Sequence, residues 1–81
     1  MYSIQVEDDV KAQLVELHPK RFKQVVLCIY SLQHNPRPPE CTILDAEACR
    51  ISAGPYRILY YVDDSARRVH IVAIREQIGS E

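Results

Sequence analysis

Three prolines crowd into residues 35–40, NPRPPE, and they divide the chain into two halves of different character. Proline lacks a backbone N–H and has a fixed φ, so no helix runs through this segment. Before it, apolar residues recur every three or four positions, which is typical of amphipathic helices. After it, short apolar runs alternate with turn residues, which is typical of strands. The segment therefore predicts a helical half followed by a sheet half.

The first half predicts a strand and two helices. Residues 2–6 alternate apolar and polar side chains, as a half-buried strand does. A helix follows, with Asp8 or Asp9 as its cap, and Pro19 suits the first turn of a second helix. We expect the helices to form an antiparallel hairpin that buries Val10, Leu14 and Leu17 of the first helix, and Phe22, Val25, Val26, Ile29 and Leu32 of the second.

The second half predicts a short extended piece in residues 41–44 and three strands, residues 48–53, 56–63 and 67–74. The turns between them are short, so consecutive strands should be antiparallel neighbours. The middle strand is apolar on both faces and should be central. The predicted fold is α+β with the order β-α-α-β-β-β, a helical hairpin packed on one face of a curled antiparallel sheet.

The chain has 81 residues, enough for one domain. It has no apolar run of the roughly 20 residues that span a membrane, and Ser3 argues against a signal peptide, so we expect a cytoplasmic protein. Three cysteines without a C-x-x-C pair indicate reduced thiols. The histidines supply no zinc-ligand spacing, and we expect no metal.

Arginines on the predicted hairpin are the main candidate for function. Strand parity puts Arg57 and Tyr61 on one face, and a hairpin about residues 53–55 brings Arg50 within one or two cross-strand positions of Arg57. Two close cations need an anionic partner. That partner is either an external anion or an internal acid, such as Asp45, Glu47 or the helix carboxylates.

Net charge is −1, which by itself does not predict nucleic-acid binding, but the charges are segregated. Residues 18–37 carry Lys20, Lys23 and two arginines without an acid, and residues 50–75 carry five arginines against two aspartates. The two basic segments form one patch if the fold brings them together; the alternative is a mixed, solvated surface.

The segment ACRISAGPYRILYYVDDSARRVHIVAIRE resembles the C-terminal half of the RelE/ParE toxin superfamily. The family pattern is G-x-Y-R, two hydrophobic residues and a tyrosine, then an acidic turn and a final strand of alternating aliphatics. The matching positions are Gly54, Tyr56, Arg57, Ile58, Leu59, Tyr60 and Val62. The N-terminal half is similar to the family too, so the resemblance covers nearly the whole chain.

The resemblance implies the toxin of a type II toxin–antitoxin pair, an mRNA interferase that enters the ribosome and cleaves mRNA there, inhibiting translation. The implied endoribonuclease reaction is a transphosphorylation by the ribose 2′-OH and uses no metal or cofactor. The implied partners are a cognate antitoxin, in a toxin–antitoxin hetero-oligomer, and the ribosome with its mRNA.

The resemblance also implies a catalytic set of Arg57, Arg50 and Arg75, since arginine binds phosphoryl oxygens bidentately. Lys20, Lys23 and Tyr61 are the candidate RNA- or ribosome-binding residues. The chain departs from the pattern in the strand of residues 48–53 and near its C-terminal end. Ser52 stands where many nuclease members have a second basic residue, and Gln77 stands where an arginine belongs; a C-terminal tyrosine is absent as well.

These departures leave alternatives open. A ParE-like gyrase inhibitor shares the fold without the nuclease residues. A RelE homologue that cleaves weakly, or acts only as a binding module, is the other alternative. His70 lies mid-strand, where a structural histidine is more common than a general base.

Overall fold

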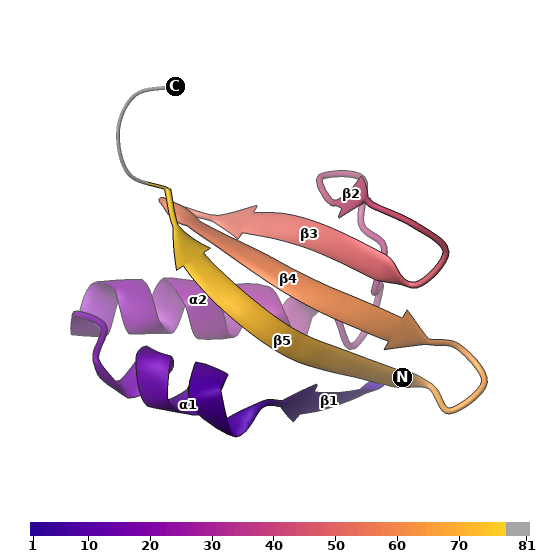
Figure 1. The fold of residues 1–81 in the computed structure, drawn as a ribbon, viewed down its shortest axis with the longest axis horizontal. Helices are drawn as coiled ribbons and strands as arrows, with labels where there is room; N and C mark the ends of the chain where they lie inside the picture. The colour runs from indigo at the N-terminus through magenta and orange to yellow at the C-terminus, as the bar shows by residue number, and fades with distance from the viewer. Residues whose placement is uncertain (78–81) are drawn as a thin grey trace.

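The structure is a computed structural model that describes residues 1–77. Two helices lie on one side of a five-stranded sheet (Figure 1). The elements are β1 Ser3–Val6, α1 Asp8–Val15, α2 Pro19–Ser31, β2 Thr42–Ile43, β3 Ala48–Ala53, β4 Tyr56–Asp63 and β5 Arg68–Glu76. The strand order is β1-β5-β4-β3-β2, with β4 in the centre. The predicted α+β architecture, element order and central strand are confirmed.

Strand direction departs from the prediction at one edge. β2, β3, β4 and β5 pair in antiparallel fashion, but β1 runs parallel to β5, with Ser3 opposite Arg68 and Val6 opposite Ile71. The sheet is therefore mixed and not wholly antiparallel. Short turns dictate antiparallel pairing only between consecutive strands. β1 and β5 are the first and last strands of the chain, and no turn connects them. Their relative direction therefore could not be inferred from a turn.

The N-terminal end of α1 differs from the prediction. The residue before α1 is Glu7, whose side chain makes no capping hydrogen bond, while Asp8 and Asp9 lie inside the first turn. Their carboxylates still suit the positive end of the helix dipole. α2 begins at Pro19 as predicted, and its cap is His18, whose Nδ1 accepts a hydrogen bond from Lys20 N at 3.2 Å.

The core lies between the helices and the sheet. α2 contributes Val25 and Ile29, and Leu32 follows directly after the helix; all three are at most 2% exposed. Phe22 was predicted to be part of this buried stripe, but it is 40% exposed. Phe22 instead lines the groove between α1 and α2. The sheet contributes the inward side chains of β3, β4 and β5, including Cys49, Ile58, Tyr60, Val69 and Ile71.

The turn between β3 and β4 sits directly over α2. Gly54 has φ of +60°, a conformation that costs a residue with a Cβ about 1 kcal/mol or more. A Cβ at Gly54 would also lie 2.6 Å from Gln24 Oε1 of α2. The first half of α2 and the hairpin turn are therefore at the same end of the molecule, as Figure 1 also shows.

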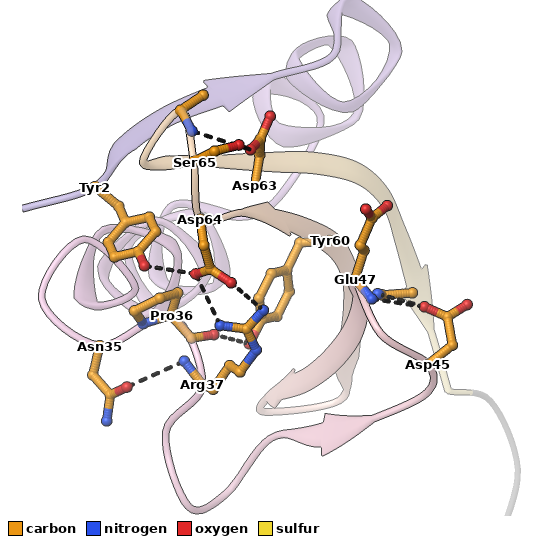
Figure 2. A network of polar contacts seen from close by, with 12 residues as sticks. Tyr2, Asn35, Pro36, Arg37, Asp45, Glu47, Tyr60, Asp63, Asp64 and Ser65 are labelled. Carbon is orange, nitrogen blue, oxygen red and sulfur yellow. Dashed lines mark hydrogen bonds and ion pairs between the residues drawn. The ribbon is translucent and has the colours of Figure 1, made fainter.

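The proline segment is tied to the sheet by a polar network (Figure 2). Arg37 donates from both Nη atoms to the carboxylate of Asp64, each at 3.1 Å, and the Tyr2 hydroxyl donates to the same carboxylate at 2.7 Å. The buried Tyr60 hydroxyl donates to the Pro36 carbonyl at 2.7 Å. Residues far apart in the sequence thus meet at the turn between β4 and β5.

None of the helices in residues 1–77 is long and apolar enough to cross a membrane.

Candidate functional site

The three arginines of the predicted catalytic set lie on the outer face, which we define as the face of the sheet turned away from the helices. Arg57 of β4 is directly opposite Ser52 of β3 on one side and Arg75 of β5 on the other. Cross-strand partners project from the same face of a sheet. Arg57 and Arg75 therefore place two cations side by side, an arrangement that is destabilising without an anion.

Arg50 lies on the same outer face, two residues from Ser52 on β3. It is opposite Leu59 of β4 and Thr42 of β2. Diagonal neighbours of this kind are about 7–8 Å apart, within reach of two long side chains. The expectation that Arg50 and Arg57 lie within one or two cross-strand positions is met.

Internal acids do not neutralise these arginines in the described part of the chain. The ion pair among residues 1–77 is Arg37–Asp64. His70 Nε2 lies 2.6 Å from Glu7 Oε2, a contact that is an ion pair only when the imidazole is protonated, and this nitrogen has no hydrogen-bond partner among these residues. Asp45, one of the acids considered above, instead accepts from the backbone N–H groups of residues 47 and 48. These bonds lower the pKa of Asp45, which keeps its carboxylate charged and occupied.

The partner that Arg57 does have is neutral. Its Nη2 donates to the side-chain Oε1 of Gln77, and Gln77 N donates to the Pro55 carbonyl at 2.8 Å. Gln77 stands at the position where the resemblance calls for an arginine. The sequence marked this residue as a departure but did not show that its amide contacts Arg57, because that contact depends on the register of β5 on β4.

Lys20 and Lys23 lie on a different layer from the arginines. Both are exposed on α2, which covers the opposite face of the sheet. They are near the β3–β4 turn but do not share the outer face with Arg57. The two basic segments therefore do not form one continuous face, and Arg37, the last cation of the first segment, pairs with Asp64.

Tyr61 shares the outer face with Arg57 and is 43% exposed, four residues farther along β4. At about 3.3 Å per residue, the two positions are about 13 Å apart. Tyr61 borders a polar hollow of about 400 Å³. The hollow is lined by Gln5, Glu47, Tyr61, Val62, Asp63, Arg68 and His70. No sequence pattern indicated this hollow, because its residues come from β1, β4, β5 and the segment before β3.

A second feature is an apolar groove of about 370 Å³ between α1 and α2. Its lining includes Val15, which is 75% exposed, and Phe22 and Val26 of α2, with Lys11 at its edge. Exposed apolar side chains gathered in one place are typical of a surface that another molecule covers.

The cysteines and histidines form no further site in the part of the chain that the structure describes. Cys28, Cys41 and Cys49 are free thiols. Burial raises the pKa of Cys49 and of Cys28, so both thiols stay protonated and are poor nucleophiles. Among residues 1–77, no three His, Cys, Asp or Glu side chains are grouped so as to hold a metal ion.

Comparison with known proteins gives matches among solved structures. No protein-family model matches the chain, and no curated protein matches it. The toxin chain of the archaeal RelE–RelB complex from Pyrococcus horikoshii superposes with a TM-score of 0.85 at 17% identity, covering 98% of each chain. The isolated E. coli RelE toxin superposes with a TM-score of 0.85 at 17% identity, covering 100% of this chain and 89% of that one.

A third structure, from the toxin–antitoxin complex RelBE2 of Mycobacterium tuberculosis, superposes with a TM-score of 0.80 at 24% identity. It covers 93% of this chain and 96% of its own. The three relatives come from an archaeon and two bacteria, and each match spans nearly the whole molecule. The chain therefore has the fold of the RelE toxins.

Proposed function

We propose that this protein is the toxin of a type II toxin–antitoxin pair and acts in the cytoplasm as a ribosome-dependent mRNA endoribonuclease. The observation that carries the proposal is the pairing of Arg57 with Arg75 on the outer face, with Arg50 on the next diagonal and no acid paired with any of them among residues 1–77. A phosphodiester supplies the negative charge that this cluster lacks. Solved structures with the same fold include RelE–RelB complexes, which supports the toxin assignment.

The arginines fit the charge that develops in RNA transphosphorylation. The ribose 2′-oxygen forms a bond to phosphorus and loses its proton, the bond from phosphorus to the 5′-oxygen breaks, and the 5′-oxygen takes up a proton. Negative charge grows on the non-bridging phosphoryl oxygens, where the planar guanidinium of Arg57 can donate two hydrogen bonds. Arg75 and Arg50 add positive charge beside it.

The phosphate has to displace Gln77 from Arg57. A phosphate is charged and can accept two parallel hydrogen bonds from the guanidinium, whereas the neutral Gln77 amide oxygen accepts one here, so phosphate is favoured over the Gln77 amide. The cost of this exchange and the absence of a basic side chain at Ser52 make a slow nuclease the expected form of the activity. The neutral residues Ser52 and Gln77, where the family pattern has basic ones, also suit a gyrase inhibitor, which needs no phosphoryl chemistry.

We place the antitoxin contact in the apolar groove between α1 and α2. Its exposed valine and phenylalanine side chains suit the apolar face of an amphipathic segment. Lys11, which lines the groove, favours an acidic residue at the edge of that segment. An acidic tail that folds on binding has this composition.

The test is cleavage of ribosome-bound mRNA by the wild-type protein and by Arg57→Ala. Loss of one preorganised donor to a developing oxyanion costs roughly a hundred- to thousandfold in rate. We expect Arg57→Ala to lose cleavage to that extent and to keep a thermal melting temperature close to the wild-type value, because Arg57 makes no described ion pair that the fold needs.

The matched control is Arg67→Asn, which removes an arginine from the β4–β5 turn and keeps a residue that tolerates its φ of 53°. It should cleave like wild type. Intact mRNA with the wild-type protein, together with blocked DNA supercoiling by gyrase, would establish the gyrase inhibitor instead. Unfolding of Arg57→Ala would show that Arg57 is structural.

A further inference from the structure

We propose that the arginine cluster of Arg50, Arg57 and Arg75 binds free oligophosphates, and that these small ligands compete there with RNA. The ligand chemistry is a linear chain of two or more phosphate groups, as in a nucleoside triphosphate or inorganic polyphosphate. The inference rests on the proposed function in taking the cluster as the RNA-binding site, and it adds a ligand class that regulates the same site.

The cluster is built on a row of cross-strand neighbours. Ser52 of β3, Arg57 of β4 and Arg75 of β5 lie opposite one another in this row. Neighbouring strands are about 4.8 Å apart, so the row is about 10 Å long. Arg50 lies on the next diagonal, about 7–8 Å from Arg57. A single phosphate covers one step of the row, whereas a triphosphate chain extends across most of it.

The charge of the cluster favours a ligand with several negative charges. An RNA phosphodiester carries one negative charge, so one phosphodiester at Arg57 leaves Arg50 and Arg75 without a counter-charge of their own. Successive phosphodiesters are separated by a ribose, but the phosphates of an oligophosphate are joined by single oxygens. The oligophosphate therefore brings more negative charge within close range of the same three guanidinium groups, where the attraction is strongest.

The acid that follows Arg75 in the sequence does not neutralise the row. Glu76 lies opposite Tyr56, a residue packed against the core, and it lines a hollow with Gln13 of α1. Its carboxylate is therefore on the helix side of the sheet, and it pairs with none of the three arginines in the described part of the chain.

The internal partner of Arg57 is neutral and is displaced at little cost. Arg57 Nη2 donates one hydrogen bond to Gln77 Oε1. An oligophosphate replaces that contact with several charge-assisted hydrogen bonds along the row. A carboxylate at position 77 would instead occupy Arg57 in place of the ligand, so Gln77→Glu, which hardly changes the shape of the side chain, should close the site.

The test is calorimetric titration of the full chain with inorganic tripolyphosphate, ATP and orthophosphate. The buffer contains no metal ions and has an ionic strength of about 0.15 M, at which exposed charges are screened beyond about 8 Å. We expect tripolyphosphate to bind at least about tenfold more tightly than orthophosphate. ATP that binds as tightly as tripolyphosphate, or more tightly, identifies a nucleotide as the ligand, and weaker binding of ATP identifies inorganic oligophosphate. Tripolyphosphate that binds no more tightly than orthophosphate overturns the proposal.

Two substitutions at exposed positions locate the ligand on the row. Arg75→Gln and Gln77→Glu should each weaken tripolyphosphate binding at least about fivefold, with melting temperatures close to the wild-type value. Gln5→Glu makes the same change of charge on β1 at the far end of the outer face, and Arg67→Asn removes an arginine from the β4–β5 turn. Both controls should bind like wild type. Wild-type affinity in Arg75→Gln and Gln77→Glu overturns the proposal.

Competition is measured with a fluorescently labelled RNA oligonucleotide bound to the wild-type protein. Tripolyphosphate should displace the oligonucleotide, because both ligands need Arg57. RNA that stays bound at saturating tripolyphosphate overturns the competition.

The titrations contain no ribosome, so they are independent of the cleavage assay. A protein that prefers tripolyphosphate but leaves ribosome-bound mRNA intact keeps the oligophosphate site and loses the nuclease function. A protein that cleaves mRNA but binds tripolyphosphate no more tightly than orthophosphate keeps the nuclease function and loses the oligophosphate site.

Discussion

Arg57 shows how one residue can be free for function inside an otherwise apolar strand. Its neighbours Ile58 and Tyr60 face the core, while Arg57 faces outward and has a neutral glutamine as its described partner. A guanidinium in this position keeps its charge available without the desolvation cost of a buried ion.

The geometry of Arg57, and not only its charge, should matter for cleavage. Lysine supplies a point charge in place of a planar fork, so Arg57→Lys should lose one of two hydrogen bonds to the phosphoryl group. A charged hydrogen bond contributes about 1.5 kcal/mol at the low end, which corresponds to roughly a tenfold loss in rate. Single-turnover cleavage on ribosomes measures it; a rate equal to that of the wild-type protein would contradict bidentate binding.

Asp64 makes stability depend on pH. The hydrogen bonds from Arg37, and next from Tyr2, hold the pKa of Asp64 below its usual value. Because the folded-state pKa is the lower one, the stabilisation is present above the unfolded-state pKa of about 3.9 and is lost as pH falls through the folded-state pKa.

Asp64→Asn should therefore unfold at lower urea than wild type at pH 6, and the difference should shrink as pH falls towards 2. Arg37→Gln removes the main cause of the shift and should show the same pattern. Urea midpoints across this pH range measure both variants. A difference that stays constant with pH would show that Asp64 contributes through neutral hydrogen bonds alone.

At the scale of elements, α1 and α2 each bury apolar side chains against the sheet and also leave apolar side chains exposed. The exposed Val15 of α1 and Phe22 of α2 both line the groove between the helices. Burying a valine side chain contributes about 1.5 kcal/mol or more, so a partner that covers Val15 gains at least tenfold in affinity from it.

Val15→Asp should therefore weaken binding of the antitoxin by more than tenfold without unfolding the toxin, because Val15 is 75% exposed. Ala12→Asp, also exposed on α1 but outside the groove, is the matched control and should bind normally. Calorimetric titration with the protein encoded by the neighbouring gene measures both affinities. Equal affinities would move the antitoxin contact to another surface.

At the scale of the whole molecule, the helix layer and the outer face of the sheet have separate tasks in the proposed function. One presents apolar side chains to a partner protein, and the other presents arginines to RNA. Substitutions on one layer should leave the other intact, since the buried core lies between them.

Expression of the wild-type chain in bacteria should slow growth, and co-expression of the antitoxin should relieve it. Arg57→Ala should grow normally at the same protein level, and it should still bind the antitoxin through the helix layer. Growth curves with matched immunoblots measure this. Normal growth with abundant, folded wild-type protein would favour a homologue that only binds.

The sequence determined the elements and their order. The signals for these elements are local. They are the prolines in residues 35–40, the apolar residues spaced three or four apart before them, and the short apolar runs that alternate with turn residues after them. Each signal acts within a few residues of where it occurs. Strand parity likewise determined that Arg57 and Tyr61 share a face of their strand, because side chains alternate along any strand.

Only the tertiary structure decided how those elements pack together and which of their side chains meet. The parallel direction of β1, the contact of Gln77 with Arg57, the pairing of Arg37 with Asp64 and the exposure of Phe22 all join residues that are distant in sequence. The register of β5 on β4, which shifts between Leu59 and Tyr60, sets which side chains meet on the outer face. Register is a property of the packed sheet, and no short stretch of sequence contains it.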